Sequence, residues 1–580
     1  MKVFCRFSVV LFLLVIMPGA YSQAPVSQAP AIIDYGSRFH PIVGNKGMVV
    51  SQSMLASQIG ADILGQGGNA IDAAVATGFA LAVTLPQAGN IGGGGFMLVY
   101  LAEQKRTVAI DYREVAPSAA VRDLFLNELG EVDVSKARFS HASAGVPGSV
   151  AGLIHALENY GNLSLSTVLK PAIELAEKGI TVTQPLAYSL ARSEQRLRKW
   201  PASVGYFFRE DGSLLRPGDR WQQKDLATTL GKIARQGRDG FYKGSVADKI
   251  VAQMKQHGGL ISHEDLANYK VVEREPVMGT YRGYTIAAMP PPSSGGVHLV
   301  QMLNILEGWE LGKLGHNSAD YLHRLIETMR RAYADRSEYL GDPDFQPVPV
   351  AQLIDKSYAQ ILRKGIDPHV ASASSDIAPA LKAPYESPQT THYSVWDDAG
   401  NVVSNTYTLN FSYGSGISVT GAGFLLNNEM DDFSAKPGVP NAYGLLGGAA
   451  NAIEPHKRPL SSMTPTIVFK QGHPAFTTGS PGGSTIINTV LQTVLNVVDF
   501  EMNIAEAAAA PRIHHQWQPD KVFVEPGLNS DTQRLLRAKG HDVVPSTRVI
   551  GRTQTISSDG KHTYGANDTR WPGGGAIAQP

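Results

Sequence analysis

The sequence predicts an α+β protein, because its apolar residues follow a helical period before residue 390 and a strand period after it. Leu55, Ile59 and Ile63 recur at the spacing of helix turns. From Thr390 to Val395 the residues alternate as those of a strand do. Among the 580 residues, 43% are hydrophobic and 18% are charged, a composition typical of a protein with a buried core and not of a disordered chain.

The charge of the chain argues against a nucleic-acid partner. The 51 Lys and Arg residues balance the 51 Asp and Glu residues, and the sequence pI is about 7.3. Proteins that bind nucleic acids present a basic patch, and this sequence has no basic run that could form one.

The N-terminus has the pattern of a signal peptide, which we expect to span residues 1–22. Lys2 and Arg6 precede an apolar run at 7–17, and small residues stand at the cleavage positions Ala20 and Ser22. The run is shorter than the about 20 residues that cross a bilayer, so an uncleaved anchor is the lesser alternative. Cleavage removes Cys5, the only cysteine, and excludes disulfides, thiolate catalysis and cysteine-ligated zinc. We expect an exported protein without a stable membrane anchor, most simply periplasmic.

The expected elements follow along the chain. Two helices of small residues, 54–65 and 70–83, are joined by a glycine turn, and three consecutive prolines make 290–296 an irregular loop. A long amphipathic helix runs from Asn317 to Leu340, with Asn317 and Asp320 as cap partners. Later segments predict a hairpin of strands 390–395 and 402–409. Two further strands are expected at 466–469 and 475–477, and a helix at 486–498.

Several motifs resemble ligand sites but lack the context those sites need. The turn at 65–70 fits a dinucleotide fingerprint, yet a helix precedes it where a strand is required. The glycines at 92–95 enter a strand and predict a close backbone approach. His263 and Glu264 lack the second histidine of a zinc protease, and His514 and His515 are attributed to packing. No serine elbow occurs, and we expect neither a metal nor an organic cofactor.

Thr390 is the strongest candidate for chemistry. A polar loop containing Pro388 leads directly into a strand that begins with this threonine. If the bond between Gln389 and Thr390 were cut, Thr390 would carry both a hydroxyl nucleophile and a free α-amine. An α-amine has a pKa of about 7.7–8.0, so near neutrality a useful fraction could accept the hydroxyl proton. Taken alone, the pattern is far more typical of an ordinary strand start than of a catalytic threonine.

Motifs spread over nearly the whole chain strengthen this interpretation. In order they are GGNAIDAAVA, PQAGNIGGGGFM, IDYREVAP, MPPPSSGG, AYADRSEYLGDPDF, QTTHYSV, LNNEMDDFSAKPGVPN, KRPLSSMTPT, GSPGGS and YGANDTR. In these motifs the sequence closely resembles the γ-glutamyltransferase (γ-glutamyl transpeptidase) family of N-terminal nucleophile hydrolases.

The resemblance implies a four-layer α/β/β/α sandwich and a precursor that cuts itself between Gln389 and Thr390. A large subunit, 23–389, and a small catalytic subunit, 390–580, of about 39 and 20 kDa, would stay together as a heterodimer. The implied donors are glutathione and other γ-glutamyl compounds. The implied acceptors are water, amino acids and peptides.

The resemblance also implies a role for each site residue. Arg113 would clamp the donor α-carboxylate, aided by the hydroxyls of Ser461 and Ser462. The donor α-ammonium would be received by Asn410, Glu429 and Asp432. Glu429 stands where some family members have glutamine. Thr408 would support the nucleophile, and the amides of Gly482 and Gly483 would stabilise the oxyanion.

Alternatives remain open for these residues and for the function. Arg113 and Asp432 could form a structural ion pair, and the two glycines a plain turn. The segment 432–448 resembles a lid with Tyr443 as its gating aromatic, or it is a plain surface loop. The competing functions are a cephalosporin or glutaryl acylase with the same threonine chemistry, and an uncleaved periplasmic protein that binds γ-glutamyl compounds.

Overall fold

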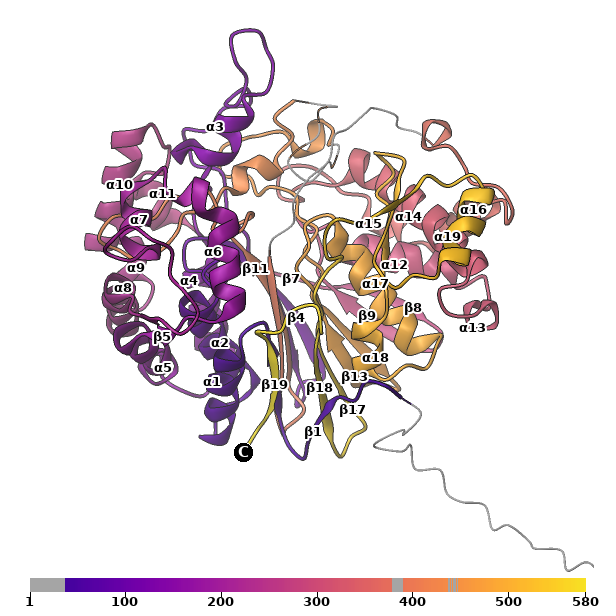
Figure 1. Ribbon diagram of the computed structural model, residues 1–580, viewed down its shortest axis with the longest axis horizontal. Coiled ribbons are helices and arrows are strands. Elements are labelled where there is room, and N and C mark those ends of the chain that lie inside the picture. Colours follow the sequence, from indigo (N-terminus) through magenta and orange to yellow (C-terminus); the bar gives the residue numbers. More distant parts are fainter. Residues whose placement is uncertain (1–36, 378–389, 437–438, 440, 442–444, 446) are drawn as a thin grey trace, which may run out of the picture. The chain divides into compact units, whose positions relative to one another are not determined.

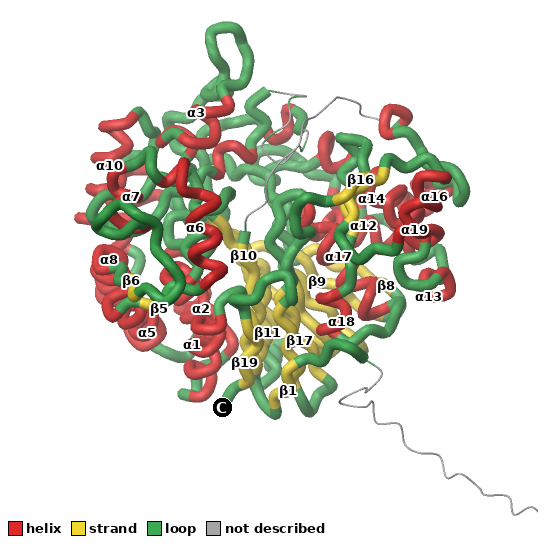
Figure 2. Tube along the Cα trace, viewed as in Figure 1, coloured by secondary structure: helices red, strands yellow, loops and turns green. Residues whose placement is uncertain are grey.

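Two antiparallel β-sheets lie face to face, and helices cover the outer face of each (Figure 1; Figure 2). The structure, a computed structural model, describes residues 37–377, 390–436, 439, 441, 445 and 447–580, and every element below belongs to the compact unit 39–580. The predicted α+β class and the four-layer α/β/β/α arrangement are confirmed. The expected signal peptide, 1–22, lies outside the described residues.

The first sheet contains the strand that starts beside Thr390. Its described strands are, in order, β19 (Gly575–Ala578), β2 (Met48–Ser51), β10 (Thr391–Trp396), β11 (Val402–Thr408), β3 (Gly94–Leu101), β4 (Arg106–Tyr112) and β7 (Val272–Arg274). β10 and β11 form the predicted hairpin, and Thr391 pairs with Tyr407. β10 is therefore a central strand, buried along its whole length.

The second sheet stacks on the first. Its described strands are, in order, β1 (Ile42–Gly44), β18 (Thr563–Asn567), β17 (Gln554–Ser558), β13 (His473–Thr478), β12 (Thr466–Lys470), β9 (Tyr284–Ala288) and β8 (Val277–Tyr281). Polar side chains link the two sheets: the Ser394 hydroxyl donates to the Gln554 carbonyl at 2.9 Å, and Ser404 accepts from the Thr466 amide at 3.1 Å. These bonds add direction to an otherwise apolar interface.

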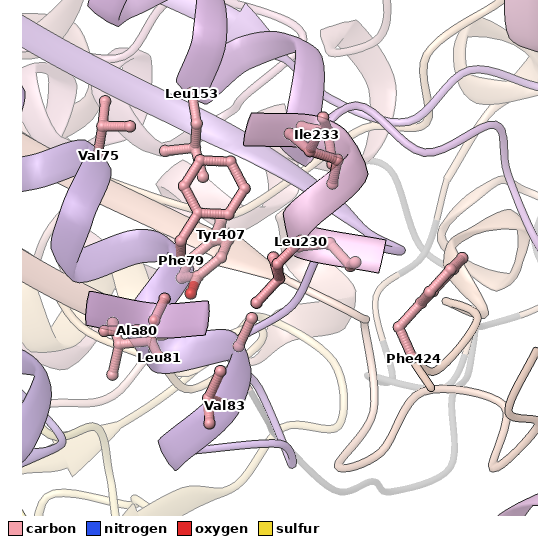
Figure 3. Close-up of a cluster of buried hydrophobic side chains, with 14 of the residues drawn as sticks. Val75, Phe79, Ala80, Leu81, Val83, Leu153, Leu230, Ile233, Tyr407 and Phe424 are labelled. Atoms are coloured by element: carbon pink, nitrogen blue, oxygen red, sulfur yellow. The ribbon is translucent and has the colours of Figure 1, made fainter. Parts of the chain in front are cut away.

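Helices pack on the first sheet from one side. They are α1 (Met54–Gly65), α2 (Ala70–Thr84), α4 (Ser149–Tyr160), α5 (Leu165–Lys178), α6 (Gln184–Leu197), α7 (Pro201–Phe207), α8 (Lys224–Gln236) and α10 (Gly244–His257), with the shorter α3 (Val134–Phe139), α9 (Asp239–Tyr242) and α11 (His263–Asn268) and a small ribbon of β5 (Ile180–Thr181) and β6 (Arg220–Trp221). α2 is buried along almost its whole length, because its small residues allow close packing on both sides. Figure 3 shows Phe79 of α2 beside Leu153 and Tyr407, and the Tyr407 hydroxyl donates to the Gly78 carbonyl at 2.9 Å.

The second sheet has its own helical layer. It contains α12 (Gly295–Leu306), α13 (Leu311–Leu314), α14 (Ala319–Tyr339), α15 (Val350–Leu353), α16 (Lys356–Lys364), α17 (Thr485–Val498), α18 (Ile504–Ala509) and α19 (Ser530–Ala538), with a small sheet of β14 (Ile513–His514), β15 (Val522–Val524) and β16 (Val543–Pro545). Within the described residues, no helix is both long and apolar enough to cross a membrane.

Most predicted elements are confirmed, and two boundaries differ. α14 is capped by Ser318, whose hydroxyl accepts from the Tyr321 amide, so the expected cap at Asn317 and Asp320 was wrong. Asn317 instead has a φ of 54° and lies outside the helix. The irregular loop after Pro290 ends earlier than expected, because α12 begins at Gly295.

The motifs set aside in the sequence are occupied by structural contacts. The N-terminus of α2, which follows the glycine turn 65–70, is capped by Asn69 and Asp72, and the Ala70 amide donates to Asp397 at 2.9 Å. Carboxylates thus already fill the position of a phosphate. His514 and His515 are buried and bonded to Asn488 and Asp520, which confirms their assignment to packing.

Candidate active site

Thr390 immediately precedes β10 and lies opposite Thr408, the last residue of β11. Its side chain is buried, with 5% of its surface exposed. The Thr390 hydroxyl points at the Thr408 hydroxyl, with 3.4 Å between the oxygens. Thr408 Oγ1 also accepts from the Asn410 amide at 2.8 Å, which fixes its orientation. The hairpin therefore places two hydroxyls side by side at one end of the sheet.

A close approach of two backbones holds Thr408 in place. A β-carbon on Gly93 would lie 1.9 Å from the Thr408 carbonyl oxygen, so only glycine fits there. The same carbonyl accepts from the Asn90 side chain at 2.9 Å. This confirms the close approach predicted for the glycines at 92–95. β11 ends soon after, since Asn410 has a φ of 72°, a conformation that asparagine tolerates.

Arg113 follows β4 and is fully buried among three carboxylates. Its Nη1 binds Glu429, its Nη2 donates to Asp432 at 2.5 Å, and Glu114 lies 3.6 Å from Nη1. Burial lowers the pKa of Arg113, but the three carboxylates outweigh this and keep it above its ordinary value. The guanidinium is therefore permanently charged.

All three carboxylates have buried oxygens without a hydrogen-bond partner among the described residues: both oxygens of Glu114, and one oxygen each of Glu429 and Asp432. Glu429 Oε2 and Asp432 Oδ1 are buried and accept no hydrogen bond from the described residues. Burial raises the pKa of both groups above the ordinary value, and Arg113 opposes that rise. A buried acceptor without a donor is costly, so both oxygens fit a ligand that brings hydrogen-bond donors or a positive charge.

Ser461 and Ser462 lie in an extended segment held against the loop before α12. The Ser461 amide donates to the Pro292 carbonyl at 2.9 Å, and the Ser461 carbonyl accepts from the Ser294 amide at 2.8 Å. Each hydroxyl accepts one bond, Ser461 from the Met463 amide and Ser462 from Arg336, both at 3.1 Å. Neither hydroxyl donates to another described residue, so both protons are available to a ligand.

Gly482 and Gly483 form the turn that precedes α17. Their φ angles are 146° and 54°, a region in which glycine is favoured. Among the described residues, neither amide donates a hydrogen bond. The positive end of the α17 dipole lies directly after them, so the turn has the chemistry of an anion-binding site.

One small cavity collects these groups. Its lining includes nine residues singled out in the sequence: Arg113, Thr390, Thr408, Asn410, Glu429, Asp432, Ser461, Ser462 and Gly483. Gly482 is the neighbour of a lining residue, and Gln389 and Tyr443 lie outside the described residues. Asn441 and Leu445, from the predicted lid segment, also line the cavity.

Arg336 lines the same cavity and was missed by the sequence interpretation. It lies in the last turns of α14, where 4% of its surface is exposed. The motif AYADRSEYLGDPDF contains Arg336, but α14 carries four arginines, and the sequence does not show which one faces a cavity.

The histidine of β10, His392, is buried and hydrogen-bonded between the two sheets. His392 is fully buried and bonded to Thr406 at 2.8 Å and Ser394 at 3.1 Å. Burial lowers the pKa of His392 to about 3, so the ring is neutral at physiological pH. Its two hydrogen bonds leave it no free nitrogen to act as a base for Thr390.

Comparison with known proteins assigns the chain to a family. A family model described as Gamma-glutamyltranspeptidase matches residues 56–578. The chain belongs to the gamma-glutamyltranspeptidase family. The Glutathione hydrolase proenzyme of Escherichia coli (strain K12) is 52% identical over 555 residues, which cover 95% of each chain. The resemblance seen in the motifs is confirmed, and the protein is an enzyme of this family.

Solved structures support the fold of this family member. The cephalosporin acylase from Bacillus halodurans is 30% identical, with a TM-score of 0.82 over 95% of this chain and 99% of that chain. The gamma-glutamyltranspeptidase of Helicobacter pylori is 48% identical, with a TM-score of 0.56 over 56% of this chain and 93% of that chain. Both likenesses agree with the four-layer arrangement.

Proposed function

We propose that the chain is a proenzyme that cleaves itself before Thr390 and then cleaves the γ-glutamyl amide of glutathione and related compounds. The observation that carries the proposal is the cavity that Thr390 lines together with the buried guanidinium of Arg113, the carboxyls of Glu429 and Asp432 with one unpaired oxygen each, and Gly483, whose amide makes no hydrogen bond with the described residues. A γ-glutamyl donor has an α-carboxylate, an α-ammonium and an amide carbonyl. Each finds a complementary group.

Maturation creates the catalytic base. The Thr390 hydroxyl attacks the Gln389 carbonyl, the peptide nitrogen leaves as the Thr390 amine, and water hydrolyses the resulting ester. In the precursor that nitrogen is an amide and cannot accept a proton, whereas the free amine has a pKa of about 7.7–8.0. Thr408 would orient the nucleophile in both reactions, because the two hydroxyls are neighbours.

The two fragments would remain associated as a heterodimer. Each of the two sheets contains strands from both the proposed large subunit, 23–389, and the proposed small subunit, 390–580. Backbone hydrogen bonds join β10 to β2, β11 to β3 and β12 to β9 across that division. Separation would expose these ladders and the apolar interface between the sheets.

Donor binding would use both the guanidinium of Arg113 and the carboxylates of Glu429 and Asp432 that pair with it. Arg113 would turn one face from Asp432 and Glu429 to the donor α-carboxylate, assisted by the protons of Ser461 and Ser462. The α-ammonium would take its place beside Glu429, Asp432 and Asn410. The donor is a zwitterion at its α-carbon, so the exchange conserves the charge of the buried site.

The chemical steps follow from this pose. Thr390 Oγ1 attacks the γ-carbonyl, the Thr390 amine takes its proton, and the amides of Gly482 and Gly483 hold the oxyanion. The leaving amine departs with that proton, and a γ-glutamyl ester of Thr390 remains. Water, an amino acid or a peptide amine then takes the acyl group. None of these steps calls on a metal or an organic cofactor.

The lid and the location of the protein belong to the same proposal. Residues 432–448, with Tyr443, would cover the cavity and restrict water, since the described residues Asn441 and Leu445 already line it. The signal peptide 1–22 would direct the enzyme to the periplasm.

An acylase of the same fold is the second candidate. The relation to the cephalosporin acylase structure favours it, but a glutaryl donor has no ammonium to satisfy the free oxygens of Glu429 and Asp432. Comparison of γ-glutamyl-p-nitroanilide with glutaryl-p-nitroanilide separates the two functions. We expect the γ-glutamyl donor to be strongly preferred.

Intact-mass analysis and N-terminal sequencing of the exported protein test the proposal. We expect fragments of about 39 and 20 kDa, the smaller beginning Thr-Thr-His-Tyr. The variant Thr390→Ala should remain one chain. A wild-type protein that stays a single chain, binds γ-glutamyl compounds and hydrolyses none would instead be a binding protein.

A further inference from the structure

Arg336 is a buried cation without a paired anion. Within the described residues, no carboxylate oxygen lies within 4.0 Å of its guanidinium. Other buried arginines differ: Arg113 has three carboxylates, and Arg512 pairs with Asp568 at 2.8 Å. Asp432 attracts the charge of Arg336 from a greater distance, but it is engaged by Arg113. A buried charge without a partner is costly unless a ligand completes it.

The hydrogen bonds of Arg336 orient the serine pair. Its Nε donates to Ser294 Oγ at 2.9 Å, and that hydroxyl donates to the Ser461 carbonyl at 2.7 Å. Its Nη2 donates to Ser462 Oγ at 3.1 Å. Because a guanidinium can only donate, Ser462 must accept here and must direct its own proton elsewhere.

One part of the guanidinium remains available. Nη1 of Arg336 donates to no described residue, and the side chain lines the cavity with Arg113 and Thr390. Burial lowers the pKa of Arg336 to about 10, which still leaves it charged at neutral pH. The cavity therefore has two guanidinium groups and only one described set of counter-ions, around Arg113.

We propose that Arg336 is a second binding residue for the donor α-carboxylate, which lies in the complex between Arg336 with Ser462 on one side and Arg113 on the other. The inference rests on the proposed function and deepens it, because it assigns to this cation part of the selectivity for α-amino acid donors. Two guanidinium groups would make the site intolerant of donors that lack the carboxylate.

Three anilide donors test this assignment. γ-Glutamyl-p-nitroanilide carries both α-groups, glutaryl-p-nitroanilide lacks the ammonium, and 4-aminobutyryl-p-nitroanilide lacks the carboxylate. Initial rates without added acceptor give kcat/KM for wild type and Arg336→Met. We expect a loss of about 10²-fold on the two donors with a carboxylate and a change within about threefold on 4-aminobutyryl-p-nitroanilide. Arg324→Met, on the same helix and away from the cavity, is the control.

Equal losses of Arg336→Met on all three donors, or no loss on any, would overturn the inference. Self-cleavage and a melting temperature no lower than that of wild type establish that the variant is folded. If Arg336→Met yields no mature protein, Arg336→Lys gives the same comparison, with an expected loss of about tenfold confined to the carboxylate-bearing donors. A mature wild type that hydrolyses none of the three donors would refute the proposed function itself.

Discussion

Replacing Glu429 with glutamine separates the charge of this residue from its shape. Glu429 Oε1 accepts from Arg113, and its buried Oε2 has no partner in the described structure. Glutamine keeps an oxygen for Arg113 but carries no charge for the donor ammonium. A hydrogen bond with one charged group is worth about 1 to 2 kcal/mol more than one between neutral groups, so we expect kcat/KM to fall roughly 5- to 30-fold.

The loss should depend on pH in a defined direction. Burial raises the pKa of Glu429 well above its ordinary value, against the pull of Arg113. At low pH the wild-type carboxyl is protonated and resembles glutamine, so the ratio of wild-type to variant kcat/KM should approach 1. As pH rises and Glu429 ionises, the ratio should grow to its full value. Ionisation of the substrate and of the Thr390 amine cancels in this ratio.

Hydrolysis of γ-glutamyl-p-nitroanilide far below KM, from pH 5.5 to 9, measures the ratio. Glutaryl-p-nitroanilide is the control, because it has no ammonium and Glu429→Gln removes a competitor for Arg113. We expect no loss on this donor. A ratio that is the same at both ends of the pH range, or an equal loss on both donors, would refute the assignment of Glu429 to the ammonium.

Three other substitutions test the scaffold of the site. Thr408→Val removes the acceptor of the Asn410 amide and the neighbour of Thr390, and should slow self-cleavage and lower kcat about tenfold, followed by gel electrophoresis and anilide hydrolysis. Gly93→Ala places a β-carbon 1.9 Å from the Thr408 carbonyl and should abolish maturation, whereas Gly205→Ala, which meets no atom within 4 Å, should not. Burial raises the pKa of Glu114 from 4.5 to about 7, so the folded state binds the extra proton between these values and loses stability as pH rises through them. Glu114→Gln should therefore melt at a higher temperature than wild type at pH 8.5, by a stability gain of about 3 kcal/mol, and approach wild type near pH 5 in scanning calorimetry.

The elements that the sequence predicts well are those whose pattern is local. The helix 70–83 and the hairpin after residue 390 were correct to within a residue or two, because apolar period and turn residues act over short distances. The cap of α14 was assigned to the wrong residues, because Asn317, Ser318 and Asp320 are all acceptable caps by type. Only the backbone path selects Ser318.

The family resemblance indicated nine cavity residues, but their electrostatic state depends on burial. Glu429 and Asp432 are ordinary acids in the sequence. In the fold both bind Arg113, and each has one buried oxygen without a hydrogen-bond partner. Burial raises the pKa of both carboxyl groups. No pattern of neighbouring residues contains this information, because desolvation arises from atoms contributed by distant segments.

By itself the sequence determined the chemistry available to this protein: a threonine at a strand start, a single cysteine at position 5, and the ordered motifs of one family. Tertiary structure decided how that chemistry is assembled. Arg113 meets Glu429 across 316 positions, and Arg336 reaches Ser462 across 126. The physical reason is that residue type fixes what a group can donate, accept or ionise, whereas the packing of two sheets and their helices fixes which groups share a cavity and which charges remain unpaired.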